Sequence, residues 1–152
     1  MKEEATKNKG IFKGSNFAVI ANSLEIRDDI YIKMNKKQKM FVLKKIEKIL
    51  SNYGIKNYLL FGSFLNRKWF RDIDIVIFDN IKEDKIIEIS AKIESEIGIE
   101  VDIKHYKEIP LPVKFSLITS GVGKIDNKLR ASSIDFVRSY IDFIEWFKAR
   151  NG

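Results

Sequence analysis

The fold is decided by residues 61–78, which read Phe61-Gly-Ser-Phe-Leu-Asn-Arg-Lys-Trp-Phe-Arg-Asp-Ile-Asp-Ile-Val-Ile-Phe78. A Gly-Ser pair closes the apolar run of residues 58–61, and an Asp-Ile-Asp triplet opens the apolar run of residues 73–78. Short apolar runs that end at glycine or polar residues are typical of buried strands. The stretch therefore predicts two strands joined by a loop or a short helix.

The Asp-Ile-Asp triplet places two carboxylates on one face of the second strand. Side chains at positions i and i+2 of a strand point the same way, so Asp72 and Asp74 address a single point. Carboxylates held together repel each other, and a hard divalent cation such as Mg²⁺ relieves that repulsion through oxygen ligands. The alternative is that both side chains are simply solvated at the end of the strand.

Two further features are consistent with phosphate chemistry. Gly62 lets the backbone approach a ligand closely, and Ser63 adds a hydroxyl and an N–H group where a helix begins, which suits phosphate oxygens. Asp102 lies in an alternating strand at residues 99–103, which could bring it beside the first two carboxylates. Three carboxylates on adjacent strands would suit a two-metal phosphoryl-transfer site.

The rest of the middle of the chain alternates between helical and strand patterns. Apolar residues recur at helical spacing over residues 37–52 and 84–97, and each run is followed by glycine, at Gly54 and Gly98. The order helix, strand, strand, helix, strand indicates an α+β (α/β-like) fold with a small mixed β-sheet flanked by helices.

The two ends of the chain have weaker patterns. Short strands are predicted at residues 17–20 and 30–32, and a strand or helix at residues 113–118. We predict a turn at Gly121-Val-Gly123 and a terminal helix over residues 131–148, with apolar side chains along one face.

Composition narrows the class of protein only modestly. Lys and Arg number 28 against 21 Asp and Glu, so the net charge of +7 favours anionic partners, although biased amino-acid usage explains it equally well. The sequence has no cysteine, which excludes disulfides and thiolate metal sites. It shows no membrane-spanning run and no signal peptide, and we therefore expect a cytoplasmic location.

The motif residues together resemble the DNA polymerase β-like nucleotidyltransferase superfamily. The pattern of that superfamily is Gly-Ser, a spacer, Asp-x-Asp on the next strand, and a third Asp. Within the superfamily, the chain is similar to the minimal nucleotidyltransferases (MNT) that are often antitoxins beside HEPN-domain toxins. The similarity covers residues 37–105 and includes five motif positions, namely Gly62, Ser63, Asp72, Asp74 and Asp102.

The resemblance implies a mechanism and a division into parts. Asp72, Asp74 and Asp102 would be catalytic and would hold two Mg²⁺ ions, while Gly62 and Ser63 would bind the phosphates of ATP or another NTP. The expected parts are an N-terminal extension at residues 1–33, a nucleotidyltransferase core at residues 34–128, and a C-terminal helix at residues 129–152 that packs on the core.

The loop between the two motifs is basic and aromatic. Arg67, Lys68 and Arg71 would bind the triphosphate, or else they form a solvated basic loop. Trp69 and Phe70 in the same loop would stack on a base or, as is commoner for aromatic residues in small proteins, belong to the core. His105, the sole histidine, is expected to be structural.

Three functions are consistent with these observations. The first is transfer of NMP, in the first instance AMP from ATP, to a hydroxyl acceptor with release of pyrophosphate, the acceptor being a protein partner such as a HEPN toxin. The second is a non-catalytic, antitoxin-like module that binds its partner through the same fold. The third is an RNA-directed nucleotidyltransferase that uses the positive charge to hold a 3′ end.

Overall fold

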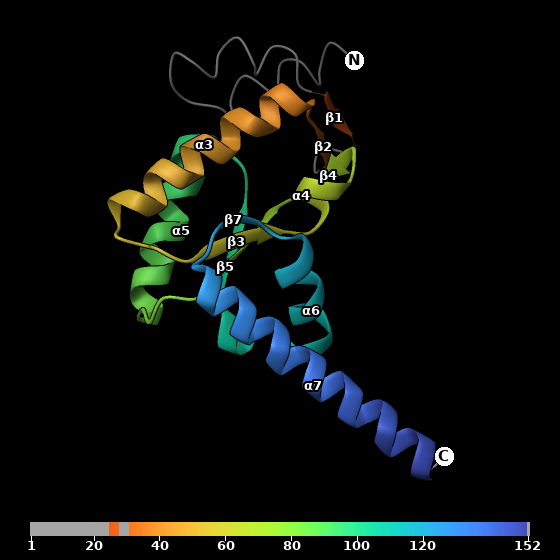
Figure 1. Ribbon diagram of the computed structural model, residues 1–152. Helices are drawn as coiled ribbons and strands as arrows, with labels where there is room; N and C mark the ends of the chain where they lie inside the picture. Colours follow the sequence, from red (N-terminus) through yellow and green to blue (C-terminus); the bar gives the residue numbers. More distant parts are fainter. Residues whose placement is uncertain (1–24, 28–30, 152) are drawn as a thin grey trace.

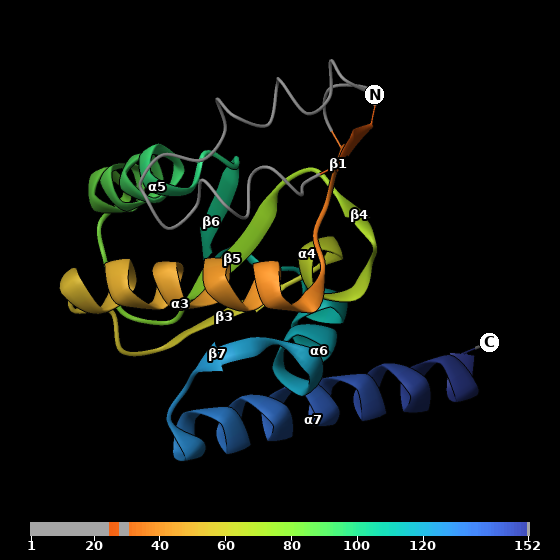
Figure 2. The ribbon, with the colours of Figure 1, turned by 90° about the horizontal axis from the view of Figure 1, so that it is seen from above.

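The structure is a computed structural model that describes residues 25–27 and 31–151. Figures 1 and 2 show one sheet at the centre, with helices on both of its faces. The elements in chain order are β1 (Glu25–Arg27), β2 (Tyr31–Lys33), α3 (Lys36–Asn52), β3 (Tyr58–Phe61), α4 (Ser63–Asn66), β4 (Trp69–Phe70), β5 (Ile73–Ile77), α5 (Glu83–Ile97), β6 (Val101–His105), a 3-10 turn (Tyr106–Glu108), α6 (Leu111–Ser120), β7 (Val122–Lys124) and α7 (Asn127–Asn151).

The central sheet has the strand order β6-β5-β3-β7. Strand β3 pairs antiparallel with both β5 and β7, whereas β5 and β6 run parallel. Helix α5 makes the crossover that a parallel pair requires. The sheet is therefore mixed, as the sequence predicts.

Helices α3 and α5 cover one face of this sheet (Figure 2). Their apolar sides pack on alternate side chains of the strands, including Leu60, Ile75 and Ile103. Helix α3 begins with a capping box, in which Asn35 accepts the Gln38 N–H and Gln38 in turn accepts the Asn35 N–H. Helix α5 ends at Gly98, whose φ of 72° lies in the left-handed region.

The opposite face of the sheet is covered by α6. Leu59 of β3 and Val76 of β5 pack there against Leu117 of α6 in a smaller apolar cluster. Asp74 is two residues before Val76 on β5, so it points to this same face. Because successive side chains of a strand point to opposite faces, the large core lies on one face of the sheet and the carboxylates lie on the other.

A second, three-stranded sheet lies beside the N-terminal end of α3 (Figure 1). Its order is β1-β2-β4 and all of its pairs are antiparallel. Ile32 of β2 stands opposite Phe70 of β4, and both side chains are buried in the main core. Residues 31–33 are therefore joined to the loop that separates the Gly-Ser and Asp-Ile-Asp motifs.

The terminal helix α7 packs near its start on α6 and then extends away from the sheet (Figure 1). Val137 and Ser133 are buried against the rest of the protein. Along another side of the helix, five aromatic side chains are between 46% and 63% exposed, namely Phe136, Tyr140, Phe143, Trp146 and Phe147. We call these five residues the aromatic stripe. None of the helices formed by residues 25–27 and 31–151 is long and apolar enough to cross a membrane.

Several predicted elements differ from those observed. The predicted turn at Gly121–Gly123 is wrong, because β7 pairs there with β3. Glycine permits this close pairing, since a Cβ at Gly123 would collide with the Tyr58 carbonyl oxygen. The short strand β4 was not predicted. The strand predicted at residues 17–20 lies outside the described residues.

The packing of α5 yields a prediction about stability. Ile89 is fully buried and Ile87, on the same helix, is 63% exposed. We expect Ile89→Ala to lower the free energy of unfolding by about 2–5 kcal/mol because it leaves a cavity, and the control Ile87→Ala to change it by less than about 0.5 kcal/mol. Urea denaturation measures both values, and equal losses would contradict this packing.

Candidate active site

The parallel pairing of β5 with β6 brings two of the predicted carboxylates together. In this register Asp74 stands directly beside Asp102. Neighbouring strands are separated by roughly 4.8 Å, so the two side chains rise from the same face at close range. Asp72 precedes the first residue of β5 and is two positions from Asp74.

Burial and the charges of two neighbouring carboxylates act on Asp74. Burial, followed by the charges of Asp72 and Asp102, raises the pKa of Asp74 from 3.8 to about 6, although Lys104 opposes the change. A raised pKa means that the ionised form of this carboxylate is disfavoured in the folded protein. A bound cation would remove this penalty, which is an arrangement common at functional sites.

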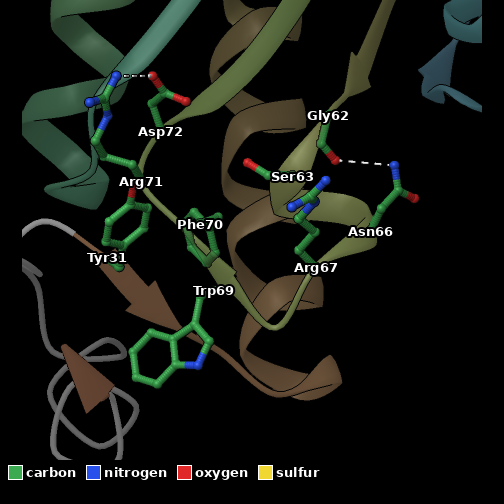
Figure 3. Close-up of a pocket in the computed structure, with 9 residues that line it drawn as sticks. All are labelled: Tyr31, Gly62, Ser63, Asn66, Arg67, Trp69, Phe70, Arg71 and Asp72. Carbon is green, nitrogen blue, oxygen red and sulfur yellow. Dashed lines mark hydrogen bonds and ion pairs between the residues drawn. The ribbon is translucent and has the colours of Figure 1, made fainter. Parts of the chain in front are cut away.

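The outer two carboxylates are turned toward basic neighbours. One Asp72 oxygen lies 3.9 Å from an Arg71 nitrogen (Figure 3), and one Asp102 oxygen lies 3.6 Å from Lys104 Nζ. In the described part of the chain, no three acidic or histidine side chains are grouped so that they could hold a metal ion. The backbone thus aligns Asp74 and Asp102, while the outer side chains are not gathered around a single point.

Two independent features of the backbone at residue 62 favour glycine there. Its φ of 86° is in the region that side chains rarely adopt, and a Cβ there would lie 2.6 Å from Asp74 Oδ2. Phe61, the preceding residue, pairs with Asp74 across β3 and β5. Gly62 is therefore packed directly against the carboxylate, and α4 begins at Ser63, the second residue of the motif.

A cavity of about 600 Å³ opens beside this motif (Figure 3). Its wall combines backbone at Gly62, a hydroxyl, two guanidinium groups, one carboxylate and aromatic rings. The nine residues that line it are Tyr31, Gly62, Ser63, Asn66, Arg67, Trp69, Phe70, Arg71 and Asp72. Asp74 and Asp102 do not line the cavity, although Asp74 adjoins Gly62 at its edge.

The three basic side chains of the loop between the two motifs differ in their relation to the cavity. Arg67 and Arg71 both line the cavity, whereas Lys68 does not. Lys39 of α3 fixes the position of the loop, because its Nζ donates a hydrogen bond of 2.9 Å to the Arg67 carbonyl oxygen. Two of the three side chains predicted to bind phosphate therefore line the cavity.

The aromatic residues of the loop have separate roles. Phe70 is 1% exposed and meets Phe64 edge to face at 4.9 Å between ring centroids, as expected for a core residue. Trp69 is only half-buried and lines the cavity. Tyr31 and Asn66 also line it and were not predicted. Only the register of β2 with β4 brings Tyr31 there, and that long-range pairing has no local signal.

His105 has the structural environment that the sequence predicts. Its Nδ1 accepts the Lys107 N–H at 3.1 Å, and its Nε2 is 3.0 Å from the Asp79 carbonyl oxygen. Nε2 must then carry the proton in order to donate to that carbonyl. Both ring nitrogens are engaged by backbone, so the ring connects the end of β6 to the turn that follows β5.

The chain belongs to the polymerase β nucleotidyltransferase family. The family described as "Polymerase beta, Nucleotidyltransferase" matches residues 44–128, which is more than half of the 152 residues. The match contains the Gly-Ser pair and all three aspartates. The resemblance noted from the motifs alone is thereby confirmed. A search of the curated proteins found no match.

Three solved structures that share this fold come from toxin–antitoxin pairs. A chain of the toxin-antitoxin MntA-HepT is 18% identical, with a TM-score of 0.54 over 73% of this chain and 93% of that one. A chain of a toxin-antitoxin with AMP-PNP is 17% identical, with a TM-score of 0.56 over 76% and 94%. A chain of the tri-AMPylated Shewanella oneidensis HEPN toxin in complex with MNT antitoxin is 16% identical, with a TM-score of 0.53 over 74% and 93%.

The raised pKa of Asp74 leads to a prediction about stability and pH. Because the pKa is about 6 in the folded protein and 3.8 as the reference, the folded state holds the proton more tightly, and the contribution of Asp74 to the free energy of unfolding falls as pH rises from about 4 to about 7. After a discount for partial exposure, the fall is about 1–2 kcal/mol.

The variant Asp74→Asn should lack this fall. In EDTA we expect it to match the native protein near pH 4 and to be more stable at pH 7.5, as measured by urea denaturation across the pH range. Glu100→Gln, an exposed carboxylate beside β6, is the matched control and should leave the fall intact. Parallel pH profiles for native protein and Asp74→Asn would contradict the burial and repulsion described above.

Proposed function

We propose that this protein is a metal-dependent nucleotidyltransferase that transfers AMP from ATP to a hydroxyl group of a protein partner and releases pyrophosphate. The observation that carries the proposal is the alignment of Asp74 with Asp102, packed against Gly62 at the edge of the cavity. A binding module has no physical need to place a half-buried carboxylate among two others. A phosphoryl-transfer site does, because a cation there stabilises charge on the phosphate.

The donor set fits Mg²⁺. Asp72, Asp74 and Asp102 offer only carboxylate oxygens, the ligands that hard divalent cations prefer. Burial, and after it the charges of Asp72 and Asp102, raise the pKa of Asp74, and a bound cation would offset both effects. Asp72 and Asp102 would turn from Arg71 and Lys104 to complete the set. When bound, up to two ions would neutralise phosphate charge and lower the pKa of the attacking hydroxyl.

The residues of the cavity would bind and orient the nucleotide. Gly62 leaves room for a phosphate oxygen close to the backbone, Ser63 offers its hydroxyl and N–H, and Arg67 and Arg71 neutralise the triphosphate. Asp102 would accept the proton of the acceptor hydroxyl, whose oxygen bonds to the α-phosphorus as the bond from the α-phosphorus to the bridging oxygen breaks and pyrophosphate leaves. Related folds crystallised with AMP-PNP, and with a tri-AMPylated HEPN toxin, support ATP and AMP transfer as the assignment.

The exposed aromatic side chains of α7 support a protein acceptor over a small-molecule acceptor. The aromatic stripe leaves five large rings exposed on a helix that extends from the body of the protein (Figure 1). Contiguous exposed apolar patches of this kind mark protein–protein contacts. We infer that a HEPN-type partner docks on the stripe while one of its hydroxyl groups reaches the cavity.

The enzymatic step is tested with ATP labelled at either the α- or the γ-phosphate and a HEPN-domain protein from the same organism. We expect only the α-label to be transferred, only with Mg²⁺, and at least 100-fold more slowly by Asp74→Asn and Asp102→Asn. Calorimetric titration of ATP separates binding from transfer. Absence of magnesium-dependent ATP binding would overturn the enzyme proposal. ATP binding without transfer of the label to the HEPN-domain protein would leave two functions, a partner-binding module or a transferase with an RNA acceptor.

The docking surface is tested by charge insertion. Phe143→Asp should weaken complex formation with the HEPN-domain protein by more than tenfold, because it buries a charge at an aromatic contact, and should leave ATP affinity unchanged. Arg138→Ala is the matched control, since 100° per residue places Arg138 on the side of α7 away from the stripe. Equal affinities for the partner in an analytical ultracentrifuge would contradict the assignment of this surface.

A further inference from the structure

The part of the cavity farthest from the carboxylates has a chemistry that phosphate binding does not explain. Figure 3 shows Asp72 and Ser63 toward one end of the cavity and Trp69 toward the other, with Phe70 between them. Tyr31 forms the wall opposite Arg67. Polar groups that suit phosphates thus lie at one end of the same space and Trp69 lies at the other, while Tyr31 lies between them, beside Arg71.

The position of Trp69 is set by packing around β4. Its neighbour Phe70 is held in the core by Phe64, and successive side chains of a strand point to opposite sides. Trp69 is therefore directed out of the core and toward the cavity, where it is half-buried. Lys33, its partner across β2 and β4, places Nζ 5.9 Å from the ring centroid of the indole.

Tyr31 reaches the cavity from the other strand of the same pair. It begins β2, whose next residue, Ile32, is buried opposite Phe70. Tyr31 and Trp69 therefore both belong to the small sheet, and one buried pair, Ile32 with Phe70, holds that sheet against the core. A cavity of about 600 Å³ is within the usual range for a site that holds a whole nucleotide.

We propose that Tyr31 and Trp69 form the nucleobase subsite of the donor nucleotide. This inference rests on the proposed function, since it places the base of the NTP whose phosphates meet Gly62, Ser63, Arg67 and Arg71. The base stacks on aromatic surface supplied by β2 and β4, an interaction that a purine makes over a larger area than a pyrimidine. The small sheet thereby supplies affinity for the base, while the central sheet supplies the chemistry.

The test compares two ligands that share phosphates but differ in the base. ATP and inorganic tripolyphosphate are titrated calorimetrically with Mg²⁺ into the native chain, Trp69→Ala and Trp69→Phe. We expect Trp69→Ala to weaken ATP by about tenfold, to change tripolyphosphate by less than twofold, and Trp69→Phe to recover most of the loss. Arg67→Ala, the matched control at the phosphate end, should weaken both ligands.

A spectroscopic measurement reports on the ring itself. The chain has two tryptophans, so the variant Trp146→Phe leaves Trp69 as the sole indole. We expect ATP to quench the fluorescence of that variant and tripolyphosphate not to quench it. Circular dichroism melting curves establish that each variant is folded.

The outcomes separate this inference from the proposed function. If ATP binds with Mg²⁺ but Trp69→Ala weakens ATP and tripolyphosphate equally, or weakens neither, the subsite is wrong and the nucleotidyltransferase proposal stands. If the native chain binds neither ligand, both are overturned together.

Discussion

The parallel register of β5 and β6 is the constraint on which the rest of the structure depends. It sets Asp74 beside Asp102 on a face that burial and like charge both make unfavourable for an ionised carboxylate. The large core on the other face of the sheet, where Ile75 and Ile103 lie next to each other in the same register, offsets that cost. A parallel pair also requires the long crossover α5, so the electrostatics of the site depend on the packing of a helix behind it.

The cavity beside the carboxylates is built from two parts of the chain that are far apart in sequence, residues 62–72 and Tyr31. The β3–α4 turn contributes the glycine, the loop with β4 contributes the guanidinium groups, and residues 31–33 contribute a wall of the cavity. Lys39 of α3 ties these parts together through its hydrogen bond to the Arg67 carbonyl, and its side chain passes 5.5 Å from the Phe64 ring centroid. Burial lowers the pKa of Lys39, which is consistent with a lysine placed among aromatic rings.

The sequence predicts those features whose cause is local. Apolar period and glycine caps place α3 and α5 to within a residue or two of their ends, and the motif residues indicate the family without any tertiary information. Strand β7 and strand β4 could not be predicted, because each exists only through pairing with a distant strand. For the same reason, the place of Tyr31 in the cavity wall could not be predicted, because an isolated tyrosine in a short apolar run carries no local signal of that role.

The contact between Gly62 and Asp74 makes substitutions at these two positions depend on each other during evolution. A side chain at residue 62 would occupy the space of Asp74 Oδ2, so the carboxylate would have to shift if the glycine were replaced while the aspartate remains. Once a descendant chain had lost the aspartate, for instance to alanine, that steric demand would disappear and only the demand of the positive φ would persist. Replacement of the glycine is therefore least costly after loss of the carboxylate, and the positive φ still favours glycine at that stage.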